Sequence, residues 1–314
     1  MKCLVLGGAG FLGSNLCKEL IMEGHDVVVF ASNKRQYDNL KDIIDKITII
    51  TGNFEEFDKF DILTKDIDVV FHLISTTIPE TSNKNMGQDI ISNVLATINL
   101  LESCRKNNVK KVIFYSSGGT VYGIPQNVTS ISEEHPNNPT CSYGIHKLTI
   151  EKYLNLFNHL YSLDFIVMRI ANPYGERQSP NSGLGAIATF LARALSKETI
   201  EIWGDGSVTR DFIYVSDVSK AAIKLMSYEG DQKVFNVGSG RGYSLNEIVT
   251  IIESVTDEKT KIDYKEARKV DVPVNVLDIS RITNEIDWYP EVSLESGIRN
   301  MVEYYRKTLT DINI

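Results

Sequence analysis

The sequence predicts an α/β fold built on a doubly wound parallel sheet, with a smaller α/β domain near the C-terminus. Three observations lead to this prediction. Short apolar runs alternate with helical stretches through the first half, a glycine-rich turn separates the first run from the first helix, and the alternation stops after Pro173. Buried strands that alternate with helices are typical of a parallel sheet covered on both faces.

The first half of the chain divides into short apolar runs and longer amphipathic stretches. Residues 2–7 form an apolar run that stops at glycine, and residues 11–22 place apolar side chains at helical spacing. The same pattern then repeats along the chain. Further strands are expected at 26–31, 47–51, 69–73, 111–116 and 164–171, and further helices at 86–106 and 143–160.

After Pro173 the chain loses this regular alternation. Gly, Pro, Ser and Asn cluster over residues 172–185, and a second glycine turn follows at 204–206. Loops then mix with short strands and helices, which indicates a smaller second domain. We expect strands at 212–215 and 234–237 and helices at 186–196, 217–227, 245–254 and 294–307.

Composition and charge exclude several classes of protein. With 42% hydrophobic and 24% charged residues, the chain has the composition of an ordinary globular protein. Its 33 basic and 41 acidic residues give a formal charge of -8 without a long Lys/Arg run, so no nucleic-acid partner is expected. No apolar run approaches the ~20 residues that a membrane span needs, so none is expected.

The cysteines and the N-terminus bear on the cellular compartment. The 4 cysteines lack CxxC or Cys/His spacing, which indicates reduced thiols and no metal site. Met1 leads directly into the first apolar run and the glycine turn, without the pattern of a signal peptide. A cytoplasmic protein is therefore expected.

Three glycines stand at the spacing that dinucleotide-binding turns use. Gly7, Gly10 and Gly13 fit the pattern G-x-x-G-x-x-G between the first expected strand and helix, with Phe11 and Leu12 inside it. Glycine lets the backbone approach a pyrophosphate, and the helix N-terminus supplies free N–H groups. The turn therefore predicts a Rossmann-type sheet that binds a nicotinamide dinucleotide.

The glycine turn also assigns a role to each part of the chain. Residues 1–171 are expected to form the dinucleotide-binding domain, and residues 212–238 to return to it. Residues 172–314 are then expected to form mainly a substrate-binding domain, so that a cleft holds both ligands.

The end of the second strand bears on the choice between NAD and NADP. NAD-binding domains usually carry an acidic residue there, whereas this chain has Ala31 followed by Ser32, Asn33 and Arg35. NAD is the expected cofactor, and NADP stays open because these residues can accept a 2′-phosphate or simply form a solvated loop. Further cofactor contacts are expected after the third and fourth strands, at Asn53, Phe54 and Leu73.

A tyrosine and a lysine four residues apart stand at the start of an expected helix. Tyr143 and Lys147 follow the strand that ends near Ser116, whose carboxyl end faces the dinucleotide crevice. The pattern alone is weak, because Tyr37 and Lys41 form a second copy in a polar loop. A tyrosine base at neutral pH needs its pKa lowered by about 3 units. We expect Lys147 and a positively charged nicotinamide ring to supply that field.

At this point the sequence resembles a known family. Its motifs, in order and over nearly the whole chain, are similar to those of the NAD-dependent epimerase/dehydratase family of extended short-chain dehydrogenase/reductases. Within it, the UDP-glucose and UDP-N-acetylglucosamine 4-epimerases are the most similar group. The motifs are the glycine turn, residues 116–123 (SSGGTVYG), Tyr143 with Lys147, and residues 169–175, 209–215 and 235–238.

The resemblance assigns catalytic roles by position. It implies that Tyr143 takes the proton from a sugar 4-hydroxyl and that Lys147 binds the nicotinamide ribose and lowers the pKa of Tyr143. The family places a Ser or Thr at the position of Gly118, so this chain departs from the pattern there. Ser117 and Thr120 are the candidate substitutes, although hydroxyl residues in a strand-end turn also serve conformation alone.

Four residues are implied to bind the nucleotide sugar. Asn172 matches the sugar-binding asparagine, and Arg210 and Arg268 match two arginines that hold the diphosphate, although isolated arginines also form surface salt bridges. Asn275 matches a residue that faces C2 of the hexose, where asparagine leaves room for an N-acetyl group. The alternative is that Asn275 continues a Val-rich strand with its amide in solvent.

The motifs favour one reaction and leave two alternatives open. Without a carboxylate at residues 118–120, dehydration and decarboxylation are disfavoured. We expect a 4-epimerase that interconverts UDP-hexoses, with UDP-GlcNAc and UDP-GalNAc as substrates, through a transient 4-keto intermediate. The alternatives are an NADPH-dependent 4-keto-sugar nucleotide reductase and a non-catalytic nucleotide-sugar-binding protein. The resemblance also implies a homodimer, held by a four-helix bundle from residues 93–106 and 143–160.

Overall fold

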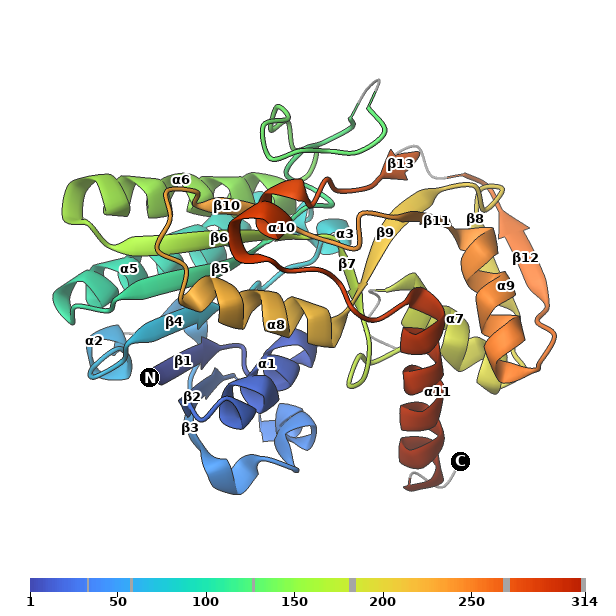
Figure 1. Ribbon diagram of the computed structural model, residues 1–314, viewed down its shortest axis with the longest axis horizontal. Helices are drawn as coiled ribbons and strands as arrows, with labels where there is room; N and C mark the ends of the chain where they lie inside the picture. Colours follow the sequence, from blue (N-terminus) through green and yellow to red (C-terminus); the bar gives the residue numbers. More distant parts are fainter. Residues whose placement is uncertain (33, 57–58, 126–127, 181–184, 268–271, 312–314) are drawn as a thin grey trace.

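A sheet of seven parallel strands dominates the computed structural model, which describes residues 1–314 except 33, 57–58, 126–127, 181–184, 268–271 and 312–314. The strand order is β10-β6-β5-β4-β1-β2-β3, so the chain winds outward from β1 in both directions (Figure 1). The expected doubly wound sheet is therefore confirmed. Its strands are β1 (Lys2–Leu6), β2 (Asp26–Ala31), β3 (Ile47–Thr51), β4 (Val69–His72), β5 (Lys111–Ser117), β6 (Asp164–Ile170) and β10 (Val234–Val237).

Residues within each strand alternate between two cores on opposite faces of the sheet. Cys3 and Val5 of β1 belong to the core that includes residues of α1 (Phe11–Met22) and α8 (Val215–Met226). Leu4 and Leu6 belong to the core that includes residues of α5 (Ala96–Lys106) and α6 (Ser142–Tyr161). Because both faces of most strands are covered, these strands are continuous apolar runs, which is why the sequence predicts them; the edge strand β3 is only partly buried.

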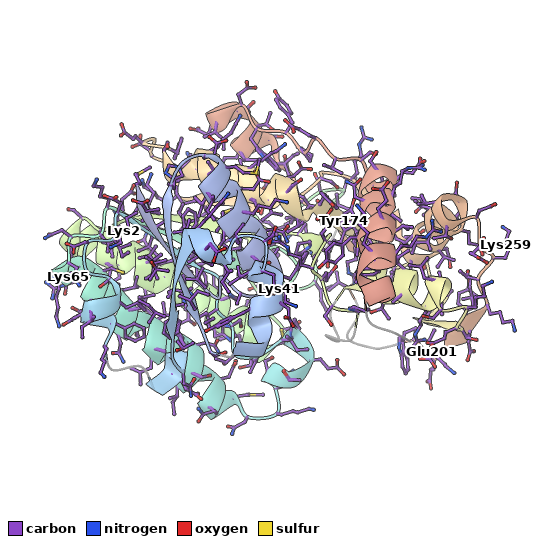
Figure 2. The ribbon with its side chains drawn as sticks, turned by 90° about the horizontal axis from the view of Figure 1, so that it is seen from below. Lys2, Lys41, Lys65, Tyr174, Glu201 and Lys259 are labelled. Carbon is purple, nitrogen blue, oxygen red and sulfur yellow. The ribbon has the colours of Figure 1, made fainter. Side chains whose placement is uncertain are left out.

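A smaller part of the chain lies beside the main sheet and has its own core. Figure 2 shows Tyr174 near the junction, with Lys2 and Lys65 on the side of the main sheet and Glu201 and Lys259 on the far side. Strands β7, β11 and β13 pair with β9, and β8 pairs with β12. The elements of this part are β7 (Asn172–Tyr174), β8 (Ile200–Trp203), β9 (Thr209–Tyr214), β11 (Gly242–Ser244), β12 (Ile262–Lys265), β13 (Val274–Asn275), α7 (Ala186–Leu195), α9 (Leu245–Thr256) and α11 (Leu294–Asp311).

The chain returns to the main sheet after it has entered the smaller part. Strand β10 pairs with β6, and α8 contributes to the same core as α1. We propose that the domain boundaries expected from the sequence, 1–171 with 212–238 and 172–314, describe this division.

The helix expected at residues 86–106 is interrupted. It consists of α4 (Met86–Asp89), a π-helical segment η4 (Ile90–Leu95) and α5. Apolar spacing does not reveal the wider turn of a π segment, so the sequence predicted one continuous helix. The remaining short elements are α2 (Phe60–Leu63), α3 (Pro79–Ser82), α10 (Ser280–Ile286) and the 3-10 turns η1 (Lys34–Leu40), η2 (Ile44–Lys46) and η3 (Phe54–Glu56).

The described residues contain neither a membrane-spanning helix nor a cluster of metal ligands. None of their helices is both long and apolar enough to cross a membrane. Within the same residues, no group of three or more His, Cys, Asp or Glu side chains is arranged to hold a metal ion.

Candidate active site

The glycine turn after β1 forms a tight cradle at the start of α1. Gly7 has φ of +83°, a conformation that favours glycine, and its N–H donates to the carbonyl of Phe30 at 2.9 Å. A Cβ at Gly13 would lie 2.3 Å from the Gly7 carbonyl oxygen, so only glycine fits there. Gly10 caps α1 without a side-chain hydrogen bond, which leaves the first helical N–H groups accessible to an anion.

This cradle fits the pyrophosphate of a dinucleotide. Such a group needs two features: a glycine backbone without side chains, which it can approach closely, and a helix N-terminus with free N–H groups. Phe11 and Leu12 begin α1 at this place and turn their side chains partly into the neighbouring cores. Leu73 follows β4, and its N–H donates to the Leu6 carbonyl at 3.1 Å, so it lies at the same edge of the sheet.

The residues expected around the adenosine differ in burial, and two of them are not fully described. Ala31 is buried at the end of β2 and Ser32 is exposed, whereas Asn33 and the side chain of Arg35 lie outside the described residues. Asn53 is exposed, and its Nδ2 donates to Glu55 Oε1 at 3.3 Å.

Phe54 lies in the core. Its ring centre is 5.5 Å from that of Phe60 and 5.3 Å from that of His72. Any contact of Phe54 with a cofactor would therefore come mainly from its backbone.

Tyr143 and Lys147 lie on the first turns of α6, beside the end of β5. The Lys147 Nζ donates to the carbonyl of Tyr115 at 2.8 Å and lies 4.7 Å from the ring centre of Phe114. The same nitrogen is 5.7 Å from the centre of the Tyr143 ring. Lys147 is buried and Tyr143 is half-buried, so the lysine ammonium is shielded from water while part of Tyr143 is accessible.

Burial shifts the pKa of both groups. It raises the pKa of Tyr143 to about 12 and lowers the pKa of Lys147 to about 7. For Tyr143 to act as a base at pH 7, its pKa must fall by about 5 units, or about 7 kcal/mol in favour of the phenolate. The ammonium of Lys147, in its protonated form, supplies part of that preference.

An ion pair fixes α6 against the strands that carry the site. Glu151, one turn after Lys147, accepts from Arg169 of β6 at 2.6 Å and from Ser116 Oγ of β5 at 2.5 Å. Both charged side chains are 4% exposed. Removing either partner would leave a buried charge, so this pair holds the helix in register with β5 and β6.

The turn after β5 explains the missing hydroxyl at Gly118. A Cβ there would lie 2.6 Å from Cδ1 of the buried Leu277, so a serine fits only if the Leu277 side chain moves. The hydroxyl of Thr120 is buried and has no hydrogen-bond partner among the described residues, whereas Ser117 is half-buried. Gly144 brings α6 close to this turn, since a Cβ there would lie 2.9 Å from the Thr120 carbonyl oxygen.

Asn275 is buried next to the same turn. It is 1% exposed, and its Nδ2 donates to the Gly118 carbonyl at 3.2 Å. Its Oδ1 has no partner among the described residues. The alternative that its amide lies in solvent is therefore wrong.

A cavity of about 270 Å³ lies in the smaller part of the chain, next to the end of β6. Asn172 and Arg210 line it; Asn172 donates to the Asp211 carbonyl at 3.0 Å, and Arg210 donates to the Val272 carbonyl at 2.5 Å. Arg268 lies outside the described residues. The sequence reasoning missed the apolar lining of this cavity, which includes Phe190, Trp203, Phe212 and Leu245.

One signal for this lining was present in the sequence. Trp203 stands directly before the glycine turn at 204–206, and an aromatic side chain can stack on a planar ring.

The sequence profile of the NAD dependent epimerase/dehydratase family matches residues 3–238. The chain belongs to this family. The expectations of an NAD-dependent enzyme and of NAD as the family's cofactor are therefore confirmed. The family reuses one fold for several reactions, so the choice among them rests on the site.

Three proteins are similar to this chain over nearly its whole length. A UDP-glucose 4-epimerase from Thermotoga maritima, solved with UDP-glucose, is 36% identical with a TM-score of 0.92, covering 98% of this chain and 100% of its own. A UDP-N-acetylglucosamine 4-epimerase from Methanobrevibacter ruminantium, solved with UDP-N-acetylmuramic acid, is 31% identical with a TM-score of 0.92, covering 98% of both chains. A dTDP-4-dehydro-6-deoxyglucose reductase of Escherichia coli is 32% identical over 309 residues, which are 96% of this chain and 97% of the relative.

Proposed function

We propose that this family member is a UDP-sugar 4-epimerase. The observation that supports the proposal most is the placement of Tyr143 and Lys147 at the carboxyl edge of the sheet, together with a cavity lined by Asn172 and Arg210 beyond the end of β6. The two epimerase structures described above have the same fold over nearly the whole chain.

In this proposal the chain's own residues handle a proton and hold the sugar. Bound NAD supplies the hydride acceptor and the positive charge that further lowers the pKa of a nearby phenol. Tyr143 takes the proton from the 4-hydroxyl as C4 loses its hydride, and later returns it to the 4-keto oxygen as the same hydride comes back to C4, after the sugar has turned its other face. Lys147 stabilises the phenolate, and Thr120 Oγ1 bonds the same sugar oxygen. The residues that would hold the cofactor are Gly7, Gly10, Phe11, Leu12, Gly13, Ser32, Asn53 and Leu73, joined by Asn33, Arg35 and the backbone of Phe54.

The cavity suits the nucleotide half of the substrate. The Trp203 ring and other apolar side chains offer a flat surface for a base, and Arg210 offers a guanidinium for a diphosphate. We propose that Arg268 adds a second guanidinium and that Asn172 contacts the sugar. A base at one end and a diphosphate at the other direct the hexose toward Tyr143.

Asn275 supports a substrate with an N-acetyl group at C2. It pairs in register with Arg210 across β13 and β9, and it contacts Gly118 beside the catalytic turn. It therefore links the diphosphate end of the site to the sugar end. Its partnerless Oδ1 can accept a hydrogen bond from an acetamido N–H.

We expect the wild type to interconvert UDP-GlcNAc and UDP-GalNAc at least as fast as UDP-glucose and UDP-galactose. Asn275→Tyr should lower kcat/KM for the N-acetyl pair about 10-fold or more while sparing the other pair, because a bulky ring blocks only one substrate class. Proton NMR of each reaction mixture measures both rates.

Because Asn275 is buried, a tyrosine there could disturb folding as well as substrate binding, so Asn275→Tyr needs a control variant. Asn275→Ala removes the amide without adding bulk, so it should keep both activities within about 10-fold while losing any preference for the acetamido group. Equal losses for both sugar classes in Asn275→Tyr, or no turnover of N-acetyl sugars by the wild type, would refute this substrate assignment.

One observation favours an NADPH-dependent 4-keto-sugar nucleotide reductase as a second candidate. Ala31 is buried at the end of β2, where a ribose-binding acid usually stands. Mass spectrometry of the nucleotide released from denatured protein separates the candidates. Tightly held NAD supports the epimerase, whereas NADP, together with consumption of added NADPH, supports the reductase.

We also propose that the chain forms a homodimer through the face made by α4, η4, α5 and α6. Exposed apolar side chains lie on three of these elements, α4, η4 and α6: Met86, Ile90, Ile91, Leu95, Ile145, Leu156, Leu160 and Tyr161. Exposed apolar surface on neighbouring helices is typical of a helix-bundle interface.

The double variant Leu95→Arg/Leu156→Arg is expected to convert the dimer into a monomer, because two buried charges per subunit would face each other. Sedimentation equilibrium should give twice the 35.3 kDa chain mass for the wild type and once that mass for the variant. Met22→Arg, at a residue 69% exposed on α1, is the matched control and should stay dimeric. A monomeric wild type would exclude the proposal.

A further inference from the structure

A buried histidine stands between the two catalytic candidates on α6, and the proposed mechanism gives it no role. His146 comes three residues after Tyr143 and one before Lys147. Its side chain is 1% exposed, and that of Asp89, its partner, is 0% exposed. Taking an imidazole and a carboxylate out of water costs free energy that their contacts must offset. Such a pair beside a reacting group is a candidate for a role in the reaction.

His146 connects three segments of the chain. Its Nδ1 lies 2.9 Å from Asp89 Oδ2 at the end of α4, and its Nε2 lies 3.4 Å from Ser75 Oγ in the loop after β4. Burial acts against the ionised form of Asp89, but hydrogen bonds from Ser142, Thr77 and His146 hold its pKa below the usual range. Since an ionised carboxylate only accepts, Nδ1 of His146 carries a proton and donates it.

Asp89 is held from several sides. Ser142 Oγ donates to it at 2.6 Å, Asn93 Nδ2 at 3.0 Å, and Thr77 Oγ1 also donates. These donors come from α6, from the π segment η4 and from the loop after β4. Because its position is fixed from three elements, Asp89 is a rigid anchor for the imidazole ring.

The imidazole in turn packs against the ring of Tyr143. The two ring centres are 5.1 Å apart and the planes are inclined by 67°, which is an edge-to-face contact. The Tyr143 backbone N–H donates to Ser82 Oγ at 3.0 Å. The start of α6 is therefore held by a hydrogen bond that does not involve the Tyr143 ring. Lys147 is also held independently, by the Tyr115 carbonyl. The His146 contact therefore acts on the Tyr143 side chain.

We infer that His146 is a positioning residue: anchored on Asp89, it holds the ring of Tyr143 in the orientation that proton transfer needs. The inference rests on the proposed function of Tyr143. A shift of about 1 Å at a reacting atom can cost on the order of 100-fold in rate. Loss of the contact should therefore lower kcat and leave the binding of the UDP-sugar and of the dinucleotide unchanged.

Two substitutions at His146 distinguish the effect of its hydrogen bond to Asp89 from the effect of its ring contact with Tyr143. His146→Ala removes both and should lower kcat by about 10-fold or more, with KM for the UDP-sugar and cofactor content within about two-fold of the wild type. His146→Phe keeps the ring but loses the bond to Asp89, and its kcat should lie between those of His146→Ala and the wild type. His159→Ala is the matched control, because His159 is an exposed histidine on the last turns of the same helix. It should keep kcat within about two-fold.

Several outcomes would overturn the inference. One is a kcat for His146→Ala within two-fold of the wild type; another is a fall in kcat that comes with matching losses of cofactor and of substrate binding, as a purely structural role predicts. If His146→Ala does not fold, His146→Phe decides, since unchanged kcat in a folded His146→Phe protein overturns the inference too. Tyr143→Phe, measured in parallel, tests the proposed function separately. An active Tyr143→Phe protein would refute the proposed role of Tyr143. If that variant is inactive, the His146 variants alone decide whether His146 positions the ring.

Discussion

Replacing Tyr143 with phenylalanine is expected to lower kcat at least about 100-fold while the protein still folds and holds its dinucleotide. The substitution deletes only the phenol oxygen. The ring keeps its edge-to-face contact with His146 and its place near the Lys147 ammonium. A loss confined to kcat therefore measures proton transfer. Rates of UDP-sugar interconversion and the absorbance of the bound cofactor check both parts of the expectation.

The chain contains its own matched control. Tyr37 and Lys41 have the same spacing as Tyr143 and Lys147, but Tyr37 lies on the 3-10 turn η1. Tyr37→Phe should leave kcat within about two-fold of the wild type, because a hydroxyl outside the site contributes little. If Tyr143→Phe kept more than a tenth of the wild-type rate, Tyr143 would not be the base.

Thr120→Val is expected to lower kcat by about 10-fold or more, and by more than Ser117→Ala does. Valine has the shape of threonine, so the change deletes one hydroxyl that is buried and partnerless among the described residues. A buried hydroxyl without a partner costs about 1–3 kcal/mol, which a substrate oxygen recovers on binding. The measurement is kcat with UDP-sugars at saturating concentration.

Ser117→Ala is the comparison, and it should have the smaller effect. The reverse order would move the role of the missing hydroxyl to Ser117, and no effect from either would mean that Tyr143 acts without such a partner. Gly118→Ser does not restore the family's pattern in this chain, because its Cβ would lie 2.6 Å from Leu277 Cδ1. We expect that variant to lose stability rather than to gain activity.

Most strands of the main sheet could be predicted because burial on both faces makes them apolar runs, and the partly buried edge strand β3 is recognisable from its three isoleucines. Strands β1, β2 and β3 match the expected ranges within a residue. Strands β7, β8, β11, β12 and β13 were missed, since they are two to four residues long and are defined by pairing within the smaller part of the chain. Local sequence carries little information about such pairing, which depends on tertiary contacts.

The residues of the candidate site also fall into two groups, those that a local motif predicts and those that depend on contacts between distant positions. Gly7, Gly13, Tyr143 and Lys147 stand out in the sequence because each is tied to a local motif, a turn or the start of a helix. The contact of Asn275 with Gly118 joins residues 157 positions apart in the chain, so no local sequence pattern predicts it. The same holds for Leu277, whose side chain occupies the space that a side chain at position 118 would need.

The most direct test of a 4-epimerase is the fate of the hydrogen at C4 of the sugar. Wild-type protein is incubated with a UDP-hexose, or with UDP-GlcNAc, in D₂O without added NADH or NADPH, and the products are followed by proton NMR. The proposal predicts a mixture of the two C4 epimers that reaches the same ratio from either side, with protium retained at C4 because the hydrogen returns to the same carbon. Deuterium at C4, or a product formed only when NADPH is added and consumed, would contradict it.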